Sequence, residues 1–349
     1  MEMRKLGRTG IAVPALCLGT MNFGEQCDEA NAFAQMDYAL ENGVNFLDTA
    51  EIYAVPPKPE TAGATERIIG AWFAARKNRD KVILATKIAG RSQQNYLRED
   101  RSFPELNARH IALGIDGSLK RLKTDYIDLY QLHWPDRPVA LFGATPFVHQ
   151  ENRIANENSP CATLEALQPF IKAGKIRAVG LSNETAWGTM RFLQEAEAHG
   201  LPRMACVQNG YSLVNRVYEI SLAEIAMRED CGLLAYSPLG QGFLSGKYMH
   251  GALPAGARRT LFNRQQRYER PPGVKAIEAY VGLARDYGLD PSQMALAYVT
   301  SRPFVTSNIL GATTLEQLKT DIGSLQVKIT PEMEARFDAV HHEWPNPAY

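Results

Sequence analysis

The fold class that the sequence predicts is α/β: a closed (β/α)8 barrel with an N-terminal β-hairpin, long loops at the carboxyl ends of its strands, and a C-terminal helix. Eight short apolar runs end in polar or glycine-containing turns, and segments with helical periodicity lie between them. The runs are apolar at successive positions, which is typical of parallel strands covered by helices on both faces. The 349 residues accommodate eight such units, because this barrel needs about 250 residues plus insertions.

The expected elements follow in chain order. Residues 3–16 have two short apolar runs around "GRTG" and predict a hairpin at the floor of the barrel. The eight expected strands are 15–20, 44–49, 82–87, 126–133, 176–183, 204–209, 232–238 and 305–312. Helical periodicity and helix-end signals are clear at 28–43, 107–123, 160–175, 184–200 and 217–232. Residues 330–343 predict one more helix.

The alternative fold is an open, doubly wound sheet that binds a dinucleotide. That fold requires GxGxxG after the first strand, and "LGTMNFG" (18–24) does not match it. Since there is no linker and no low-complexity segment, we expect one domain over residues 1–349. Three connections are unusually long and follow strands, so they are expected on the carboxyl-end rim as lids or binding loops: 88–106, 134–160 and 240–270.

The composition excludes several classes of protein. Lys plus Arg equals Asp plus Glu at 38 each, whereas a nucleic-acid-binding surface normally requires a basic excess. The start "MEMRKLGRTG" lacks the apolar core of a secretory signal, and no run approaches the roughly 20 apolar residues of a membrane span. The five cysteines form no CxxC pair, which predicts reduced thiols in a cytoplasmic protein and no metal site.

Three expected strands end in side chains that carry chemistry. Asp48, Lys87 and His133 each close an apolar run, and Tyr53 lies on the loop that follows Asp48. The carboxyl ends of all strands of a (β/α)8 barrel surround one mouth, so these four side chains are expected to converge. Singly, each has a plainer interpretation as a cap, a core histidine or a loop aromatic. Together they predict an active site.

These four side chains form a coherent set for giving a proton to a carbonyl oxygen. A free tyrosine titrates at about pH 10, and a neighbouring lysine cation is expected to lower the pKa of Tyr53. Asp48 would keep Lys87 charged, and His133 would add a second donor to the substrate oxygen. No side chain is a source of hydride, so the set implies a nicotinamide cofactor.

Five motifs extend this pattern: "NFLDTAEIY", "LATKIAG", "YIDLYQLHWPD", "VGLSN" and "AYSPLGQGFLSGK". In this order, and from about residue 3 to about 340, they resemble the aldo-keto reductase superfamily, especially bacterial NADP(H)-dependent reductases related to potassium-channel β subunits. The resemblance implies a TIM barrel, direct hydride transfer from NADPH to an aldehyde or ketone, and no metal. The catalytic tetrad of the family corresponds to Asp48, Tyr53, Lys87 and His133.

The resemblance also implies a set of cofactor-binding residues. The nicotinamide carboxamide would be held by Ser182, Asn183 and Gln208, and its ring would stack on Tyr236. The loop that follows would wrap the pyrophosphate, with an arginine clamp at Arg258 or Arg259. The loop residues expected to contribute are Ser237, Pro238, Leu239, Gly240, Gly242 and Lys247.

The adenosine phosphate is expected at the N-terminus of a helix after the eighth strand, where free N–H groups and the helix dipole favour an anion. The matching residues are Gly311, Ala312, Thr313, Gln317 and Asp321. Two positions depart from the family pattern. Thr314 stands where many members have a basic residue, and Asp321 where many have asparagine. NADPH is the expected cofactor, with its preference over NADH left open by these departures.

The expected substrate is a small carbonyl compound, and Trp134, Phe142 and Phe147 suggest an apolar wall for it. Oligomeric state, physiological substrate and reaction direction are not indicated by the sequence. Two other functions stay open: an NADP(H)-binding regulatory or auxiliary subunit with little turnover, and a lyase or aldolase that uses Lys87 as a Schiff-base amine.

Overall fold

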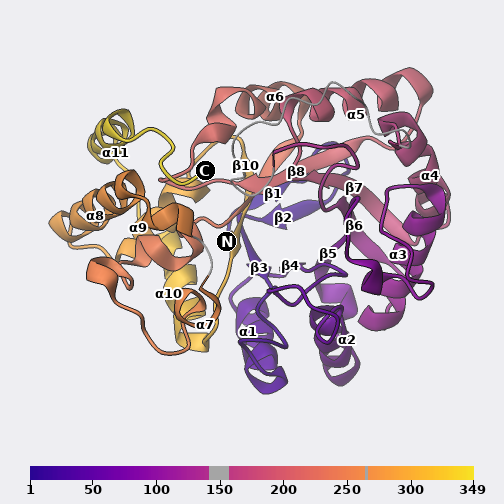
Figure 1. The fold of residues 1–349 in the computed structure, drawn as a ribbon, viewed down its shortest axis with the longest axis horizontal. Helices are drawn as coiled ribbons and strands as arrows, with labels where there is room; N and C mark the ends of the chain where they lie inside the picture. Colours follow the sequence, from indigo (N-terminus) through magenta and orange to yellow (C-terminus); the bar gives the residue numbers. More distant parts are fainter. Residues whose placement is uncertain (141–156, 264–265) are drawn as a thin grey trace.

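The computed structural model describes residues 1–140, 157–263 and 266–349. Its centre is a closed parallel barrel in which the strands follow chain order and β10 pairs with β3. The helices surround this barrel (Figure 1), so the predicted fold class is confirmed. The barrel strands are β3 Leu16–Gly19, β4 Phe46–Asp48, β5 Ile83–Ile88, β6 Ile127–Leu132, β7 Ile176–Ser182, β8 Met204–Gly210, β9 Gly232–Tyr236 and β10 Val305–Leu310.

The five predicted helical segments before β9 all contain helices, and the last of them is interrupted. Residues 217–232 form a short 3-10 turn, Val217–Ile220, and then α6, because Ser221 leaves the helical conformation between them. The first seven helices are α1 Glu29–Glu41, α2 Ala64–Arg76, α3 Ala108–Leu122, α4 Pro160–Lys172, α5 Ala186–His199, α6 Leu222–Glu229 and α7 Arg258–Phe262. The remaining helices are α8 Pro271–Asp286, α9 Pro291–Thr300, α10 Leu315–Gly323 and α11 Pro331–Glu343. Among the described residues, no helix is both long and apolar enough to span a membrane.

The N-terminal hairpin closes the floor of the barrel, as predicted. It consists of β1 Met3–Lys5 and β2 Ala12–Pro14, which pair antiparallel. Leu6 and Val13 are fully buried in one apolar cluster with inward-facing barrel residues. The turn reaches the start of β8, where a Cβ added to Gly7 would lie 2.6 Å from a carbonyl oxygen. The close approach and the positive φ of this residue both favour glycine.

The inward-facing side chains change from apolar to polar toward the carboxyl ends of the strands. Because side chains alternate between the faces of a strand, residues two apart point into the barrel together. In four strands an apolar residue of the inner cluster is followed two positions later by a buried polar one: Phe46 by Asp48, Ala85 by Lys87, Leu129 by Gln131, and Cys206 by Gln208. A polar layer therefore lies between the apolar interior and the mouth.

The long connections after the strands are partly structured. The one after β5 contains a 3-10 turn at Asn95–Leu97, and the described part of the one after β9 contains three 3-10 segments and α7. Buried Arg98 donates to both carboxylate oxygens of Glu51, which holds the β5 loop against the segment after β4. Phe142 and Phe147, expected to form part of a substrate wall, lie outside the described residues.

Candidate active site

A cavity of about 1270 Å³ opens at the carboxyl ends of the strands. It brings together residues from many strand ends and from the segment after β9. The predicted residues that line it are Asp48, Tyr53, His133, Ser182, Asn183, Gln208, Tyr236, Ser237, Pro238, Leu239, Gly242, Lys247, Arg258, Gly311, Thr313, Gln317 and Asp321. Lys87, Gly240 and Ala312 are buried and are not part of its wall. One continuous space thus contacts nearly the whole predicted site.

Lys87 and Asp48 form a buried ion pair directly below the cavity. The Lys87 Nζ lies 2.5 Å from Asp48 Oδ2 and donates a second hydrogen bond to the Thr49 carbonyl at 2.8 Å. Burial favours the neutral amine, but the interactions of the amine with Asp48 and Tyr53 outweigh it and raise the pKa of Lys87. A fully enclosed, charged amine is not a nucleophile. The arrangement disfavours a Schiff base at Lys87.

Asp48 is also held by two glutamine amides. Its Oδ1 accepts from Gln131 Nε2 at 3.0 Å and from Gln208 Nε2 at 2.8 Å. Gln131 is a site residue that the sequence reasoning missed, although it stands two positions before His133 on the same inward face of β6. Gly180 on the neighbouring β7 provides space for the Cys206 side chain, because a Cβ there would lie 2.8 Å from its sulfur.

Tyr53 lines the cavity beside this ion pair. The Lys87 Nζ lies 4.9 Å from the centre of its ring. The expectation that Lys87 lowers the pKa of Tyr53 below its ordinary value is wrong for the net effect. Burial raises the pKa of Tyr53, and the opposing pull of the Lys87 charge is not strong enough to cancel it. The hydroxyl therefore keeps its proton at neutral pH, next to a cation that would stabilise its anion.

His133 completes the predicted tetrad from the end of β6. Its ring lies edge-on to Tyr53, with 5.5 Å between the ring centres. Its backbone N–H donates to the Ile88 carbonyl at 2.9 Å, which fixes it against β5. Burial, helped by the charge of Lys87, holds the pKa of His133 well below its usual value. The ring is neutral at physiological pH, so it can offer one N–H donor without adding a charge.

The residues expected around the nicotinamide form a connected polar network. Asn183 donates from Nδ2 to the His133 carbonyl at 2.8 Å and accepts at Oδ1 from the Tyr236 hydroxyl at 2.7 Å. Ser182 Oγ donates to the Gln208 carbonyl at 2.9 Å. Asn183 and Ser237 both have positive φ, which is uncommon for residues other than glycine and concentrates at functional sites. Thr185 caps the helix that follows, so Ser182 and Asn183 are not needed for that role.

The two arginines proposed as a clamp have different surroundings. Arg258 lines the cavity and donates to Asn22 and Gln241, so it connects the loop after β3 with the segment after β9. Arg259 instead forms an ion pair with Glu269 at 2.8 Å and does not line the cavity. Of the two alternatives, only Arg258 is placed to contact a ligand there.

The N-terminus of α10 is organised around Thr314. Its hydroxyl accepts from the Gln317 backbone N–H at 3.2 Å, and the Gln317 side chain accepts from the Thr313 N–H at 2.9 Å. This arrangement is a variant of the S/T-x-x-E/Q capping box, in which the Gln317 side chain accepts from the residue before the N-cap instead of from the N-cap itself. A basic side chain at position 314 could not accept the hydrogen bond from the Gln317 N–H. Thr314 therefore has a structural role that explains the departure from the family pattern, and two of the N–H groups expected for an anion are already bonded within the protein.

Asp321, the second departure, is buried in the cavity wall. Burial and the charge of Asp290 raise the pKa of its carboxyl to about 7, against a weaker opposing effect of Lys247. Near neutral pH the carboxyl is therefore partly protonated and can donate a hydrogen bond. Its burial therefore gives this aspartate a donor that a charged carboxylate would lack.

Asp321 should also make stability depend on pH. Its pKa is about 7 in the folded chain, against an ordinary value of 3.8 for an aspartate in the unfolded chain, so between these values the folded state binds more protons than the unfolded state. Stability then falls as pH rises from about 4 to about 7. Asp321→Asn should raise the free energy of unfolding at pH 8 by at most on the order of 4 kcal/mol. Urea unfolding of both proteins at pH 5 and pH 8 measures this, and an equal effect at both values would contradict it.

Several lining residues were not predicted. The cavity wall also contains Arg267 and Arg270, which precede α8, together with Lys247 and Arg258. The connection 240–270 was expected at the rim, but no motif singled out Arg267 and Arg270 within it as residues of the cavity wall. The wall thus has four cationic side chains where two were expected.

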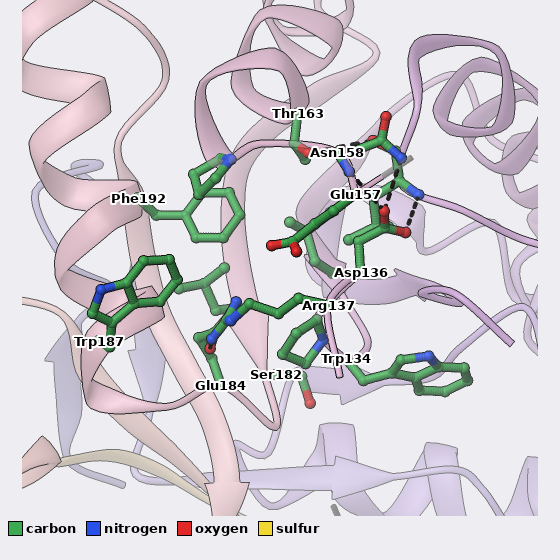
Figure 2. Close-up of a pocket in the computed structure, with 15 residues that line it drawn as sticks. Trp134, Asp136, Arg137, Glu157, Asn158, Thr163, Ser182, Glu184, Trp187 and Phe192 are labelled. Atoms are coloured by element: carbon green, nitrogen blue, oxygen red, sulfur yellow. Dashed lines mark hydrogen bonds and ion pairs between the residues drawn. The ribbon is translucent and has the colours of Figure 1, made fainter. Parts of the chain in front are cut away.

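A smaller cavity, of about 20 Å³, lies beside the first (Figure 2). Trp134 and Ser182 line both cavities. Asp136 accepts from the backbone and side-chain nitrogens of Asn158 at 3.0 and 2.8 Å, and also pairs with Arg91. These contacts anchor the segment after β6 and support Trp134, which lies 4.8 Å from the His133 ring. The small cavity has room for about one water molecule and lies within this packed region.

Known proteins share this chain's pattern over its whole length. Residues 15–342 match the family model described as the Aldo/keto reductase family. The chain is 49% identical over 350 residues to Protein tas of Escherichia coli, covering all of both chains. It is 35% identical to the uncharacterized oxidoreductase YrpG of Bacillus subtilis, covering 95% of this chain and 94% of the relative. It is 27% identical to norsolorinic acid reductase B of Dothistroma septosporum, covering 99% and 82%. The chain therefore belongs to the aldo/keto reductase family, and membership implies reduction of carbonyl compounds with NAD(P)H.

Proposed function

We propose that this protein reduces an aldehyde or ketone to an alcohol with NADPH, and that Tyr53 donates the proton. The observation that carries the proposal is the buried Asp48–Lys87 ion pair beneath Tyr53, with His133 beside it, all at one cavity. This set combines a protonated hydroxyl, a fixed cation that favours its anion, and a neutral second donor. These are the requirements for general acid catalysis on a carbonyl oxygen.

The cavity residues fit a dinucleotide. Its volume of about 1270 Å³ exceeds the roughly 300–1000 Å³ of ordinary small-ligand pockets. Ser182, Asn183 and Gln208 supply the hydroxyl and amide groups that suit a carboxamide. Four cationic side chains suit phosphates, and partly protonated Asp321 could contact a base. Gly240 has no side chain and the methyl group of Ala312 is buried, so both would act through the backbone if at all.

When bound, NADPH supplies a hydride to the carbonyl carbon of the substrate. The Tyr53 hydroxyl gives its proton to the carbonyl oxygen, so the products are the alcohol and NADP⁺. Lys87 stabilises the Tyr53 anion until it regains a proton from water. Asp48, held in place by Gln131 and Gln208, keeps Lys87 charged and positioned. His133 donates to the same substrate oxygen and aligns it, and Trp134 forms an apolar side of the substrate space.

A regulatory subunit with little turnover is the second candidate. Nothing in the cavity favours it, because the proton-donating set is complete and the norsolorinic acid relatives are named reductases.

We propose that residues 1–349 work as one domain. Arg4 donates to the Val305 carbonyl at the start of β10, and the Ala348 N–H donates to the Val214 carbonyl in the loop after β8.

NADPH should be preferred over NADH, because Lys247, Arg258 and Arg270 give the cavity more positive charge than an uncharged ribose requires. We expect kcat/KM with NADPH to exceed that with NADH by about tenfold or more, which is about 1.4 kcal/mol. Parallel assays with both cofactors and a panel of small aldehydes measure this. Lys247→Met and Arg270→Met should each reduce the preference. Equal efficiency with both cofactors would contradict the proposed choice of cofactor while leaving the role of Tyr53 intact.

A further inference from the structure

Three side chains of metal-binding types meet on the outside of the barrel, where α4 packs beside α5 (Figure 1). Cys161 lies in the first turn of α4, and Glu195 and His199 lie one turn apart near the end of α5. A thiol sulfur, a carboxylate oxygen and an imidazole nitrogen from these residues all lie within 4.8 Å of one another. None of the three lines either cavity, so the cluster is separate from the site proposed above.

The spacing of the cluster suits a tetrahedral zinc ion. His199 Nε2 lies 3.3 Å from Glu195 Oε2. Bonds of about 2.1 Å from zinc to nitrogen and oxygen, at tetrahedral angles, require these two atoms to lie about 3.4 Å apart. A zinc–sulfur bond of about 2.3 Å requires about 3.6 Å from the sulfur to each of them. The Cys161 sulfur lies no more than 4.8 Å from either atom, so a shift of about 1 Å would bring it to this spacing.

The surroundings of Glu195 also favour this arrangement. Arg191, one turn earlier on α5, contacts Oε1 of Glu195, while the oxygen nearest to His199 is Oε2. Oε2 can therefore bind a cation while Arg191 continues to orient the carboxylate, as hydrogen-bonded partners of metal ligands commonly do. Glu165, exposed and one turn after Cys161 on α4, is close enough for its charge to act on the thiol. It adds negative charge beside the cluster.

We propose that Cys161, Glu195 and His199 bind one Zn²⁺ ion, with water or Glu165 as the fourth ligand. Sulfur and imidazole ligands select zinc over magnesium and calcium, which prefer oxygen. The ion would connect α4 with α5, so its binding would stabilise the folded chain. The ligands come from two helices with no short sequence motif. The sequence contains no CxxC pair and therefore predicted no metal site.

Calorimetric titration of reduced, chelator-treated protein with Zn²⁺ tests the proposal. We expect one Zn²⁺ per chain, and at least about a tenfold loss of affinity in both Cys161→Ser and His199→Ala. His342→Ala removes an exposed histidine from α11 and is the matched control, with unchanged binding. Absence of one-to-one binding, or wild-type affinity in both ligand variants, would overturn the site.

Thiol chemistry gives a second readout that does not depend on activity. Cys161 is partly exposed, whereas the other four cysteines are buried, so one thiol should react readily in the folded protein. Saturating Zn²⁺ should slow that reaction at least about tenfold, and Mg²⁺ should not. Cobalt bound in place of zinc should give a sulfur-to-metal charge-transfer band that Cys161→Ser abolishes. Unchanged thiol reactivity with Zn²⁺, or equal protection by Mg²⁺, would count against Cys161 as a ligand.

Discussion

Replacing Tyr53 with phenylalanine is expected to reduce kcat for carbonyl reduction by about 10²- to 10⁴-fold, the usual contribution of a positioned general acid. The ring fills the same space beside Lys87 and His133, so only the hydroxyl is lost. NADPH binding should persist, because the proton donor is not among the residues proposed to hold the cofactor. Steady-state oxidation of NADPH with an aldehyde measures turnover, and quenching of NADPH fluorescence measures binding.

Tyr38→Phe is a matched control for this substitution. Tyr38 lies on α1 outside the cavity wall, and its loss of a hydroxyl should leave kcat unchanged. If Tyr53→Phe retained turnover within about threefold of wild type, while the control behaved as expected, another group would have to supply the proton. If instead both turnover and NADPH binding were lost, the substitution would have damaged the cavity rather than the chemistry.

Replacing Lys87 with methionine is expected to lower the free energy of unfolding by about 3–5 kcal/mol and to abolish turnover. Removal of the ammonium leaves the buried Asp48 carboxylate without its counter-charge, which is the costly way to break a buried ion pair. The same change removes the cation that stabilises the Tyr53 anion. Urea unfolding at pH 7 and the aldehyde assay measure the two effects separately.

The double variant Asp48→Asn/Lys87→Met separates stability from chemistry. It removes both charges from the buried pair, so most of the lost stability should return. Turnover should not return, because no cation remains beside Tyr53. A double variant as unstable as Lys87→Met alone would show that the carboxylate is not what destabilises the single variant. A double variant with restored turnover would contradict the role assigned to Lys87.

The barrel was predictable because its pattern repeats. Each strand is short, apolar at successive positions and followed by a turn, and the ends of strands in such a barrel share one mouth. This rule predicted that Asp48, Lys87 and His133 lie close together, although they are widely separated along the chain. In the structure Asp48 and Lys87 form a buried ion pair, and His133 lies beside Tyr53 at the same cavity.

The details that sequence could not provide depend on burial and on three-dimensional neighbours. Gln131 stands in an apolar strand where nothing local distinguishes a structural amide from one that holds Asp48. The direction of the Tyr53 pKa shift follows from how completely the ring is enclosed, which no motif encodes. From the sequence, Thr314 was interpreted as the loss of a basic phosphate-binding residue. The structure shows that its side chain caps α10.

One measurement tests the central claim most directly: reduction of an aldehyde with NADPH carrying deuterium at both C4 positions, followed by mass analysis of the alcohol. We expect one deuterium on the former carbonyl carbon with the wild-type protein, and almost no alcohol with Tyr53→Phe under the same conditions, although that variant still quenches NADPH fluorescence. Alcohol without deuterium would exclude direct hydride transfer, and labelled alcohol formed by Tyr53→Phe at the wild-type rate would exclude Tyr53 as the proton donor.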